Sequence, residues 1–495
     1  MNLANIVNGH PAEHVALISR NRETTYGSLV EQVAGLRGGL RALGVSDGDR
    51  IALLVGNGRH FVVSYLAVLG LGAVAVPLNP TSPAPELTRE IATVGASAVI
   101  IGPTAANAWR QIDRSSVPLV QHVIATEVND LADASSLDDL IASAPVPMVE
   151  VSGDHLAVLM FTSGTAGSPR AAMLSHANLQ SNIDQVIHTD TAMVSSDIVY
   201  AVLPMFHIMG LNVVLGISLA VGATVVLVQR FDPSTALETI RDRRVTVVPG
   251  APPMWIDFSM CDTPRETFAS VRTALTGAAK MPEEAMRRLD ERFGIRLAEG
   301  YGLTEASPIV TSSGGGAWKP GSVGKVIDGV EMRIVDENGD DALSGDTGEI
   351  WVSGPNVFQG YLNDPESTAR VLTADGWLRT GDIGTTDDDG FVYLVDRAKD
   401  LIIVSGFNVF PAEVEEVLLA HSGVAEVGVI GVPHPISGEA VKAFVVPEAG
   451  VHLDEDELIA YCNGELARYK CPSKIMFVDE LPRNLSGKLL RRSLV

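Results

Sequence analysis

Between Met160 and His176 the chain reads Met-Phe-Thr-Ser-Gly-Thr-Ala-Gly-Ser-Pro-Arg-Ala-Ala-Met-Leu-Ser-His. The apolar run from Leu156 to Phe161 predicts a buried strand, which gives way to small, hydroxylated and Pro residues and then to Arg170. Small residues let backbone N–H groups approach an anion, hydroxyls donate further hydrogen bonds, and a cation neutralises charge. The pattern therefore predicts a cradle for a polyphosphate. A flexible Ser/Gly linker is the alternative, but a linker does not explain the preceding strand or the closing cation.

The spacing of the two glycines excludes a Walker A loop. Gly164 and Gly167 are three residues apart, and Arg170 follows three residues later. A Walker A loop needs four residues between its glycines and a Lys directly after the second. The P-loop ATPase class is therefore excluded.

Composition bounds the class of protein. The length of 495 residues predicts several domains, and the hydrophobic content of 46% predicts that they are globular. The formal net charge is −24. The acidic balance argues against nucleic acid and against an anionic membrane surface. The chain has only three cysteines, a sparse and odd number that predicts free thiols in a reducing compartment. The N-terminus lacks the basic start and the apolar core of a signal peptide, so we expect a cytoplasmic location. The uncharged run Leu211 to Val228 is split by Gly222-Ala223, so we interpret it as core and expect no transmembrane segment.

Further along, an apolar helix, a Gly-Ala pair and a Val/Ile-rich strand recur at Tyr65–Val76, Leu87–Ile101 and Leu211–Val228. This alternation predicts a parallel sheet covered by helices on both faces. After about residue 320 the strands shorten and acidic turns such as Asp387–Gly390 appear, which predicts antiparallel meanders with solvated turns. A last α+β module follows, so we place the domain boundary between residues 1–396 and 397–495, with a hinge at Asp396–Asp400.

Several stretches together resemble one family, the adenylate-forming (AMP-binding) enzymes, and most closely its fatty-acid–CoA ligases, the acyl-CoA synthetases. The stretches follow the family's order and are Phe161–His176, Leu203–Gly210, Glu299–Pro308, Thr347–Tyr361, Trp377–Gly384, Leu394–Glu416 and Pro482–Arg491. The resemblance implies an α/β fold: a large N-terminal domain of two α/β subdomains plus a β-barrel-like part, and a small mobile α+β C-terminal domain. It also implies that ATP and Mg²⁺ activate a carboxylic acid, a medium- or long-chain fatty acid, to acyl-AMP, which is then transferred to coenzyme A.

The resemblance also implies roles for individual residues around the nucleotide. Glu305 would bind Mg²⁺, Thr304 would contact the α-phosphate and Tyr301 would stack on adenine. The phosphates would be held by Thr162, Ser163, Gly164, Thr165, Ala166, Gly167 and Arg170, and the adenine pocket lined by Gly277, Ala278, Glu299 and Gly300. The sequence departs from the family at Arg170 and Ala171, where Lys and Gly are usual. Arg retains the charge but is a broader, planar donor.

The remaining implied roles concern ribose, the acid and the thiol. Asp382 and Arg397 would bind ribose, and Lys488 would bridge the acid's carboxylate and the α-phosphate. The other implied assignments are His207 beside the thiol tunnel, Lys399 as the hinge, Ser405 and Gly406 on pantetheine, and Arg230 on a CoA phosphate. An acyl pocket is predicted at Met205, Met209, Leu211, Met254 and Trp255, since Met suits a flexible aliphatic chain.

Three alternatives stay open from the sequence. The acyl group could go to the pantetheine of an acyl-carrier protein instead of CoA. The acid could be an aryl acid, as in 4-coumarate-like ligases, although Ile403 stands where some aryl-acid ligases carry a second Lys. The chain could also be a degenerate nucleotide- or acyl-binding sensor, a hypothesis that Arg170 and Ala171 motivate. The oligomeric state is open between a monomer and a homodimer.

Overall fold

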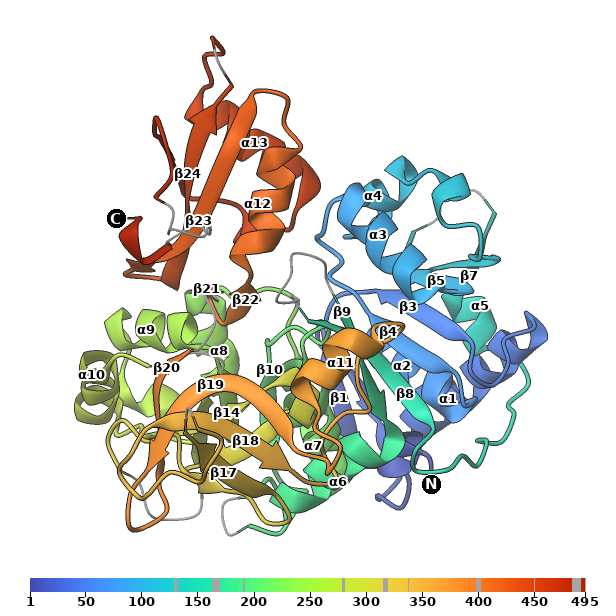
Figure 1. Ribbon diagram of the computed structural model, residues 1–495. Coiled ribbons are helices and arrows are strands. Elements are labelled where there is room, and N and C mark those ends of the chain that lie inside the picture. The colour runs from blue at the N-terminus through green and yellow to red at the C-terminus, as the bar shows by residue number, and fades with distance from the viewer. Residues whose placement is uncertain are drawn as a thin grey trace.

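The structure, a computed structural model, describes the chain except residues 129–130, 132, 163–169, 190–191, 278–280, 315–318, 337, 398–401, 449, 483–490 and 495. The described chain forms two α/β sheets, a smaller antiparallel sheet and a C-terminal domain. Figure 1 shows the C-terminal domain, in red and orange-red, above the other three parts. The predicted α/β architecture with a small α+β C-terminal domain is confirmed.

The first α/β part is built on a seven-stranded sheet of order β7-β6-β5-β3-β4-β8-β9. All neighbouring pairs are parallel except β8 with β9. Its strands are β3 (Arg50–Leu54), β4 (Val74–Pro77), β5 (Ala98–Ile101), β6 (His122–Ala125), β7 (Ala134–Ser136), β8 (Leu156–Thr162) and β9 (Arg170–Ser175). Its helices are α1 (Tyr26–Ala42), α2 (Arg59–Gly70), α3 (Ala84–Val94), α4 (Ala106–Gln111), α5 (Leu137–Ile141) and α6 (His176–Ile187).

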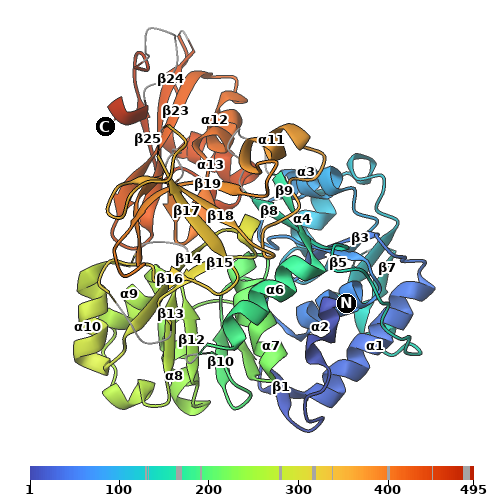
Figure 2. The same ribbon diagram turned by 60° about the horizontal axis from the view of Figure 1, so that its bottom comes forward.

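The second part is a nine-stranded sheet of order β16-β15-β14-β13-β12-β10-β11-β1-β2. Its strands are β1 (Val15–Ser19), β2 (Arg22–Thr25), β10 (Ile198–Ala201), β11 (Thr224–Leu227), β12 (Val247–Gly250), β13 (Thr273–Thr276), β14 (Leu297–Gly302), β15 (Ile309–Ser312) and β16 (Lys325–Val326). Its α-helices are α7 (Ile217–Val221), α8 (Pro233–Asp242), α9 (Pro252–Met260) and α10 (Glu283–Phe293). It also has the 3-10 helices η1 (Leu3–Val7) and η5 (Thr304–Ala306) and the π-helix η3 (Met209–Gly216). Figure 2 shows the two α/β parts side by side, the second in green and yellow.

The repeated helix–glycine–strand units behave as predicted. The helices α2, α3 and α7 each end next to a glycine with positive φ, at Gly72, Gly95 and Gly222. A left-handed residue there ends the helix and turns the chain back into a parallel strand. The uncharged run from Leu211 to Val228 forms η3, α7 and β11 within the core. Among the described residues, no helix has the length and apolar character that crossing a membrane requires.

The third part is a four-stranded antiparallel sheet of order β17-β18-β19-β20, as the shorter strands after residue 320 predict. It comprises β17 (Glu331–Val335), β18 (Gly348–Ser353), β19 (Leu378–Thr386), β20 (Val392–Arg397) and helix α11 (Pro365–Val371). Since β20 pairs with β19 as far as Arg397, the antiparallel sheet reaches one residue past the boundary placed after residue 396.

The C-terminal domain is a sheet of order β22-β21-β24-β23, with β25 paired to β24. Its elements are β21 (Ile402–Val404), β22 (Phe407–Val409), α12 (Pro411–Leu419), β23 (Val424–His434), β24 (Gly438–Pro447), α13 (Glu455–Glu465), η6 (Arg468–Lys470) and β25 (Lys474–Phe477). The domain has its own core, centred on Val414, Leu418, Val429 and Leu458. A core of its own is what defines a structural domain, so residues 402–477 form a domain separate from the other parts.

Candidate active site

The predicted phosphate cradle begins at the end of a hairpin. Strand β8 runs antiparallel to β9, and Thr162 lies directly opposite Arg170. The intervening residues of the cradle, Ser163, Gly164, Thr165, Ala166 and Gly167, lie outside the described residues. The hairpin still fixes where the cradle starts and where its cation stands, because both ends are held by strand pairing.

Arg170 is linked to Glu305 through Tyr361. The Arg170 Nε lies 3.0 Å from Asp364 Oδ2, and the guanidinium lies over the Tyr361 ring at 5.5 Å from its centroid. The Tyr361 hydroxyl donates to Glu305 Oε1 over 2.7 Å. Burial and the neighbouring Glu305 carboxylate raise the pKa of Tyr361, so the phenol keeps its proton. The cation of the cradle and the predicted metal ligand are therefore brought together.

The sequence did not single out Tyr361 or Asp364 as site residues. Tyr361 is the last residue of the stretch Thr347–Tyr361 that carries part of the family resemblance, so its position was a usable signal. Asp364 caps the N-terminus of α11 by accepting a hydrogen bond from Ser367 N. Its second contact, with Arg170, depends on tertiary packing and leaves no mark in the local sequence.

The carboxyl ends of β13 and β14 border a cavity of about 150 Å³. This is the edge of a parallel sheet where ligands bind in open α/β folds. The lining includes the predicted residues His207, Met209, Gly277, Glu299, Gly300, Tyr301 and Thr304. It also includes Gly406 and Asn408 from the C-terminal domain, so one cavity joins segments that are far apart in the chain. Asn408 was not predicted.

Tyr301 and Asp382 meet beside this cavity. Tyr301 is 6% exposed, and its hydroxyl donates to Asp382 Oδ2 over 2.7 Å. Tyr301 comes from β14 and Asp382 from β19, so the bond joins the nine-stranded sheet to the antiparallel sheet. A tyrosine ring at a cavity wall and a carboxylate at its side are the two groups predicted for adenine and ribose.

The turn Thr304–Ile309 is held by buried amide side chains. Asn182 on α6 donates to Ile309 O over 2.9 Å and accepts from Ile309 N over 3.1 Å. Asn356 donates to Ala306 O over 2.8 Å, and Asn212 donates to Ser307 O over 2.7 Å. Since Thr304 and Glu305 lie on this turn, the amides fix the position of both. None of these asparagines was predicted from the sequence.

Glycines let the chain pass close behind the cavity. A Cβ at Gly302 would collide with the Pro308 carbonyl oxygen, and one at Gly300 would lie 3.0 Å from Thr311 O. The close approach of β15 to β14 therefore requires small residues at both positions.

His207 forms the wall that faces the C-terminal domain. Burial lowers the pKa of His207 to about 4, so the ring is neutral near pH 7. The Met209 N–H donates to His207 Nδ1 over 3.3 Å, which places the ring proton on Nε2. The Phe407 ring packs edge-on against His207 with centroids 6.0 Å apart.

Thr304 and Glu305 fit a magnesium ion that arrives with a polyphosphate. Mg²⁺ prefers oxygen ligands and is commonly bound through one or two carboxylates plus substrate phosphates. Within the described ranges, no three His, Cys, Asp or Glu side chains are grouped closely enough to hold a metal by themselves. Glu305 would thus supply one carboxylate, and the nucleotide the remaining oxygens.

Some predicted site residues are not brought to this cavity or are not described. Arg230 is exposed and does not line it. Ala278, Lys399 and Lys488 lie outside the described residues, as does the side chain of Arg397, whose backbone pairs with Asp382. Ser405 immediately precedes the lining residue Gly406 and has a φ of 54°.

The residues of the predicted acyl pocket are only partly brought to this cavity. Of its five residues only Met209 lines the cavity. Met205, Leu211, Met254 and Trp255 are buried in the cores around the nine-stranded sheet, and Trp255 Nε1 donates to Leu275 O over 3.0 Å. Apolar side chains of the helices and loops that cover a sheet are buried whether or not a ligand is near, so their residue type alone does not locate a pocket. The apolar side chains that line the cavity include Met209, Val213, Leu275, Leu303 and Ile309.

A second, larger cavity of about 280 Å³ lies between the two α/β parts. Arg20, Arg59 and His60 line it, but Glu127 and Asp138 already pair with these groups. None of the predicted site residues borders it. We therefore place the candidate active site at the smaller cavity, where the predicted residues converge.

Comparison with known proteins agrees with this geometry. Residues 3–362 match the sequence profile of AMP-binding enzymes, and residues 413–488 match that of the AMP-binding enzyme C-terminal domain. The chain is 39% identical to a feruloyl-CoA synthase of an Amycolatopsis species, over 94% of this chain and 92% of that protein. It is 33% identical to a long-chain-fatty-acid–CoA ligase of Bacillus subtilis, over 98% of this chain and 91% of that protein.

A solved structure gives the same picture. A double mutant of o-succinylbenzoate CoA synthetase from Bacillus subtilis, bound with its product analogue, superimposes with a TM-score of 0.87 at 30% identity. The match covers 100% of this chain and 98% of that chain.

Proposed function

The chain belongs to the AMP-binding enzyme family, and the relatives named above are acid–CoA ligases, so we propose the following reaction for it. A carboxylic acid with an apolar, uncharged body is activated by ATP to acyl-AMP and then transferred to CoA. The observation that supports this most directly is the single cavity at β13 and β14. Residues predicted for the nucleotide line it on one side, and Gly406 and Asn408 of the C-terminal domain line it on the other.

In the first step, an oxygen of the acid's carboxylate bonds to the α-phosphorus, and pyrophosphate leaves with the electron pair of the broken P–O bond. Both reactants are anions, so the site has to screen charge and hold them in line. Arg170 is oriented by Asp364 and Tyr361 at the end of the cradle. A magnesium ion bound at Glu305 would add positive charge to the phosphates.

In the second step, the thiol sulfur bonds to the acyl carbon, AMP leaves with the electron pair of the C–O bond, and the thiol proton passes to solvent. His207 is neutral with its proton on Nε2, so in this tautomer Nε2 donates a hydrogen bond rather than accepting a proton. Its role would be to orient an acyl or carbonyl oxygen at the cavity wall. Gly406 and Asn408, which line the cavity, would contact the arm that carries the thiol.

The class of acid is proposed from the apolar wall of Met209, Val213, Leu275, Leu303 and Ile309. None of these side chains can pair with a second carboxylate or an ammonium group, so charged or dicarboxylic acids are disfavoured. A fatty acid is the first candidate, as expected from the sequence. An aryl acid is the second, and the higher identity to the feruloyl-CoA synthase and the small volume of the cavity favour it.

An ATP–pyrophosphate exchange screen across aliphatic acids of increasing length and hydroxycinnamic acids tests the proposal. We expect exchange with at least one apolar acid, followed by AMP and acyl-CoA formation when CoA is added. Exchange without acyl-CoA formation, but with transfer to a holo-carrier protein, would favour the carrier-dependent alternative. Absence of exchange with every acid would overturn the proposed activity and leave the sensor hypothesis.

A further inference from the structure

A buried ionic cluster joins the first α/β part to the C-terminal domain. Lys470 of η6 is 5% exposed, and its Nζ lies 2.5 Å from Glu86 Oε1 on α3 and 2.7 Å from Glu413 Oε1 on α12. The Glu86 carboxylate also accepts a hydrogen bond from Ala467 N over 2.7 Å. One glutamate of the first α/β part therefore anchors two groups of the C-terminal domain.

The surroundings of this cluster confirm that it lies at an interface. On the exposed rim, Arg89 of α3 donates to the Glu465 carbonyl oxygen over 3.1 Å. Surface ion pairs contribute little to stability, typically below about 1 kcal/mol. The buried pair differs, because removing one partner leaves an uncompensated charge out of water. Docking of the C-terminal domain therefore depends far more on Lys470 and Glu86 than on Arg89.

A continuous chain of side chains leads from the cluster to the candidate active site. Tyr469, next to Lys470, stacks on Phe407 with ring centroids 4.5 Å apart. Phe407 stacks on Phe206 at 6.3 Å and meets the edge of His207 at 6.0 Å. Gly406 and Asn408, the residues on either side of Phe407, line the cavity. Ring contacts thus connect the cluster to the segment that lines the cavity.

We propose that Lys470 and Glu86 are positioning residues for the second step alone: they hold the C-terminal domain in the orientation that presents Gly406–Asn408 to the acyl-adenylate. The inference rests on the proposed two-step reaction. In the first step the predicted contribution of the C-terminal domain is Lys488, which acts from a different segment. Loss of the cluster therefore slows thiol attack and leaves adenylation intact.

Glu90 adds a pH dependence to this docking. Its Oε2 has no hydrogen-bond partner among the described residues, and burial, together with the charge of Glu86, raises its pKa to about 8. The ionisable and charged groups around it are Glu86 and Arg89 on its own helix, Tyr469, Lys470 and Cys471 from the facing segment, and Glu413 from α12. The buried site accommodates protonated Glu90 better than its carboxylate. Docking of the C-terminal domain therefore weakens as Glu90 loses its proton, which happens as pH rises through about 8.

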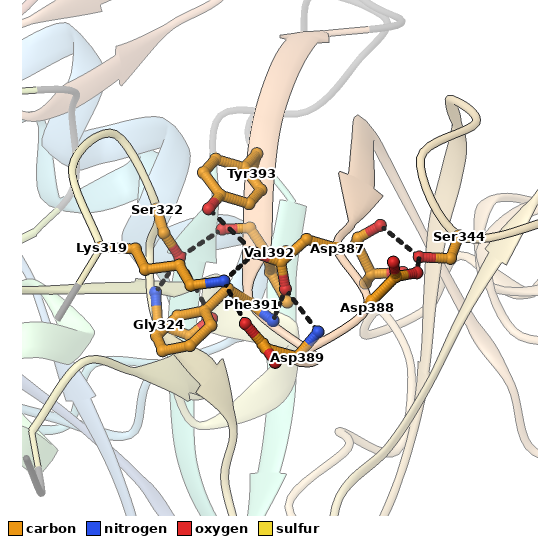
Figure 3. Close-up of polar contacts among 11 residues, drawn as sticks. Lys319, Ser322, Gly324, Ser344, Asp387, Asp388, Asp389, Phe391, Val392 and Tyr393 are labelled. Atoms are coloured by element: carbon orange, nitrogen blue, oxygen red, sulfur yellow. Dashed lines mark hydrogen bonds and ion pairs between the residues drawn. The ribbon is translucent and has the colours of Figure 1, made fainter. Parts of the chain in front are cut away.

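A lysine away from the C-terminal domain offers a matched control. Lys319 Nζ also bridges two carboxylates, at 2.6 Å from Asp387 Oδ2 and 2.6 Å from Asp389 Oδ2 (Figure 3). Asp387 also accepts hydrogen bonds from Asp389 N and Phe391 N, so its carboxylate organises the acidic turn. Lys319 lies between β15 and β16 and pairs with the turn between β19 and β20, so neither partner belongs to the C-terminal domain.

The test compares Lys470→Met, Glu86→Gln and their double variant with Lys319→Met. ATP–pyrophosphate exchange reports the first step, and single-turnover transfer from preloaded acyl-adenylate to CoA reports the second. We expect Lys470→Met to slow the second step at least about tenfold and to leave exchange within about twofold. The double variant should be no slower than the single ones, because both changes break one contact. Lys319→Met should leave both steps unchanged.

A conformational readout keeps the two proposals distinguishable. Energy transfer between one dye on α10 and one on α13 reports domain orientation without any turnover. We expect Lys470→Met to change the efficiency of energy transfer. In the wild type this efficiency should also change between pH 7 and pH 9, whereas in Glu90→Gln it should stay constant over that range. Equal loss of both steps, an unaffected second step, or unchanged energy transfer would overturn the positioning role. Absence of exchange in the wild type with a normal dye response would overturn only the proposed activity.

Discussion

At the scale of single residues, the site is defined by side chains from distant strands that orient one another. Tyr301 and Asp382 form such a pair, and Tyr361 and Glu305 form another. In each pair a phenol donates to a carboxylate, which is a stronger bond than one between neutral groups. The phenol helps to orient the carboxylate, so each tyrosine acts on binding through its partner.

Replacing Tyr301 with Phe tests the first pair. The ring stays and the hydrogen bond to Asp382 is lost, which for a charged acceptor is worth about 1.5–3 kcal/mol. We expect KM for ATP to rise by about tenfold or more, with a smaller change in kcat. Tyr26→Phe is the matched control, because the buried Tyr26 hydroxyl donates to Ala223 O over 2.8 Å and does not border the cavity. Equal KM values for both variants would contradict the ribose-side role of Asp382.

His176 makes the stability of the chain dependent on pH. Its Nδ1 accepts from Leu3 N over 3.0 Å, and burial, with smaller contributions from His155 and the N-terminal ammonium, lowers its pKa to about 4. Because the pKa is lowered in the folded state, neutral His176 contributes to the free energy of unfolding above about pH 6.5, and this contribution is lost as pH falls toward 4. The difference corresponds to about 3 kcal/mol.

We expect His176→Asn to flatten the dependence of the melting temperature on pH between 6.5 and 4, because Oδ1 can still accept the Leu3 N–H but the group no longer titrates. Thermal melts at half-unit pH steps measure this. The exposed His188→Asn is the control and should keep the wild-type slope. An unchanged slope in His176→Asn would show that another group carries the effect.

At the scale of elements, helix α6 is the scaffold of the turn Thr304–Ile309. Its first turn is closed by a capping box between Ser175 and Asn178, which starts the helix directly after β9. Asn178 then donates to Pro355 O and Val357 O, each over 2.8 Å, while Asn182 holds Ile309. One helix therefore connects the cradle hairpin to the turn that carries Glu305.

Asn182→Ala tests this scaffold. The change leaves the backbone N–H and C=O of Ile309 without these buried partners, at about 1–3 kcal/mol for each group. We expect a lower melting temperature and, because Thr304 and Glu305 shift, at least about a tenfold loss of ATP–pyrophosphate exchange with a raised Mg²⁺ requirement. Asn463→Ala, an exposed asparagine on α13, should change neither. Loss of stability with normal exchange would limit Asn182 to a structural role.

At the scale of the whole molecule, a net charge of −24 makes the compact state repel itself. Monovalent salt screens this repulsion, since the Debye length falls to about 8 Å near 0.15 M. The buried cluster around Lys470 is screened much less than surface charges, so it should survive the same change in salt.

We expect the melting temperature to rise by roughly 1–3 °C between 10 mM and 150 mM NaCl, with the same rise in KCl. The domain orientation, followed by energy transfer between α10 and α13, should stay constant over this range. A falling melting temperature would mean that surface ion pairs outweigh the self-repulsion. A salt-dependent orientation would mean that exposed pairs such as Arg89–Glu465 control docking.

By itself the sequence determined the features that depend on local periodicity and on residue type at fixed spacing. The strand before the cradle, the three helix–glycine–strand units and the small C-terminal domain all follow from such patterns, and so does the family. Local signals suffice there because chain-neighbour interactions alone specify a buried strand, a glycine turn or an amphipathic helix.

Only the tertiary structure decided which side chains meet. The partners Tyr361–Glu305 and Lys470–Glu86, the asparagines under Thr304–Ile309 and the true apolar wall of the cavity lie on segments far apart in the chain. The burial of Met254 and Trp255 in the core has the same origin, since an apolar residue on a helix that covers a sheet looks alike in a core and in a pocket. Contacts between distant segments depend on how sheets and domains pack, and no local pattern records that packing.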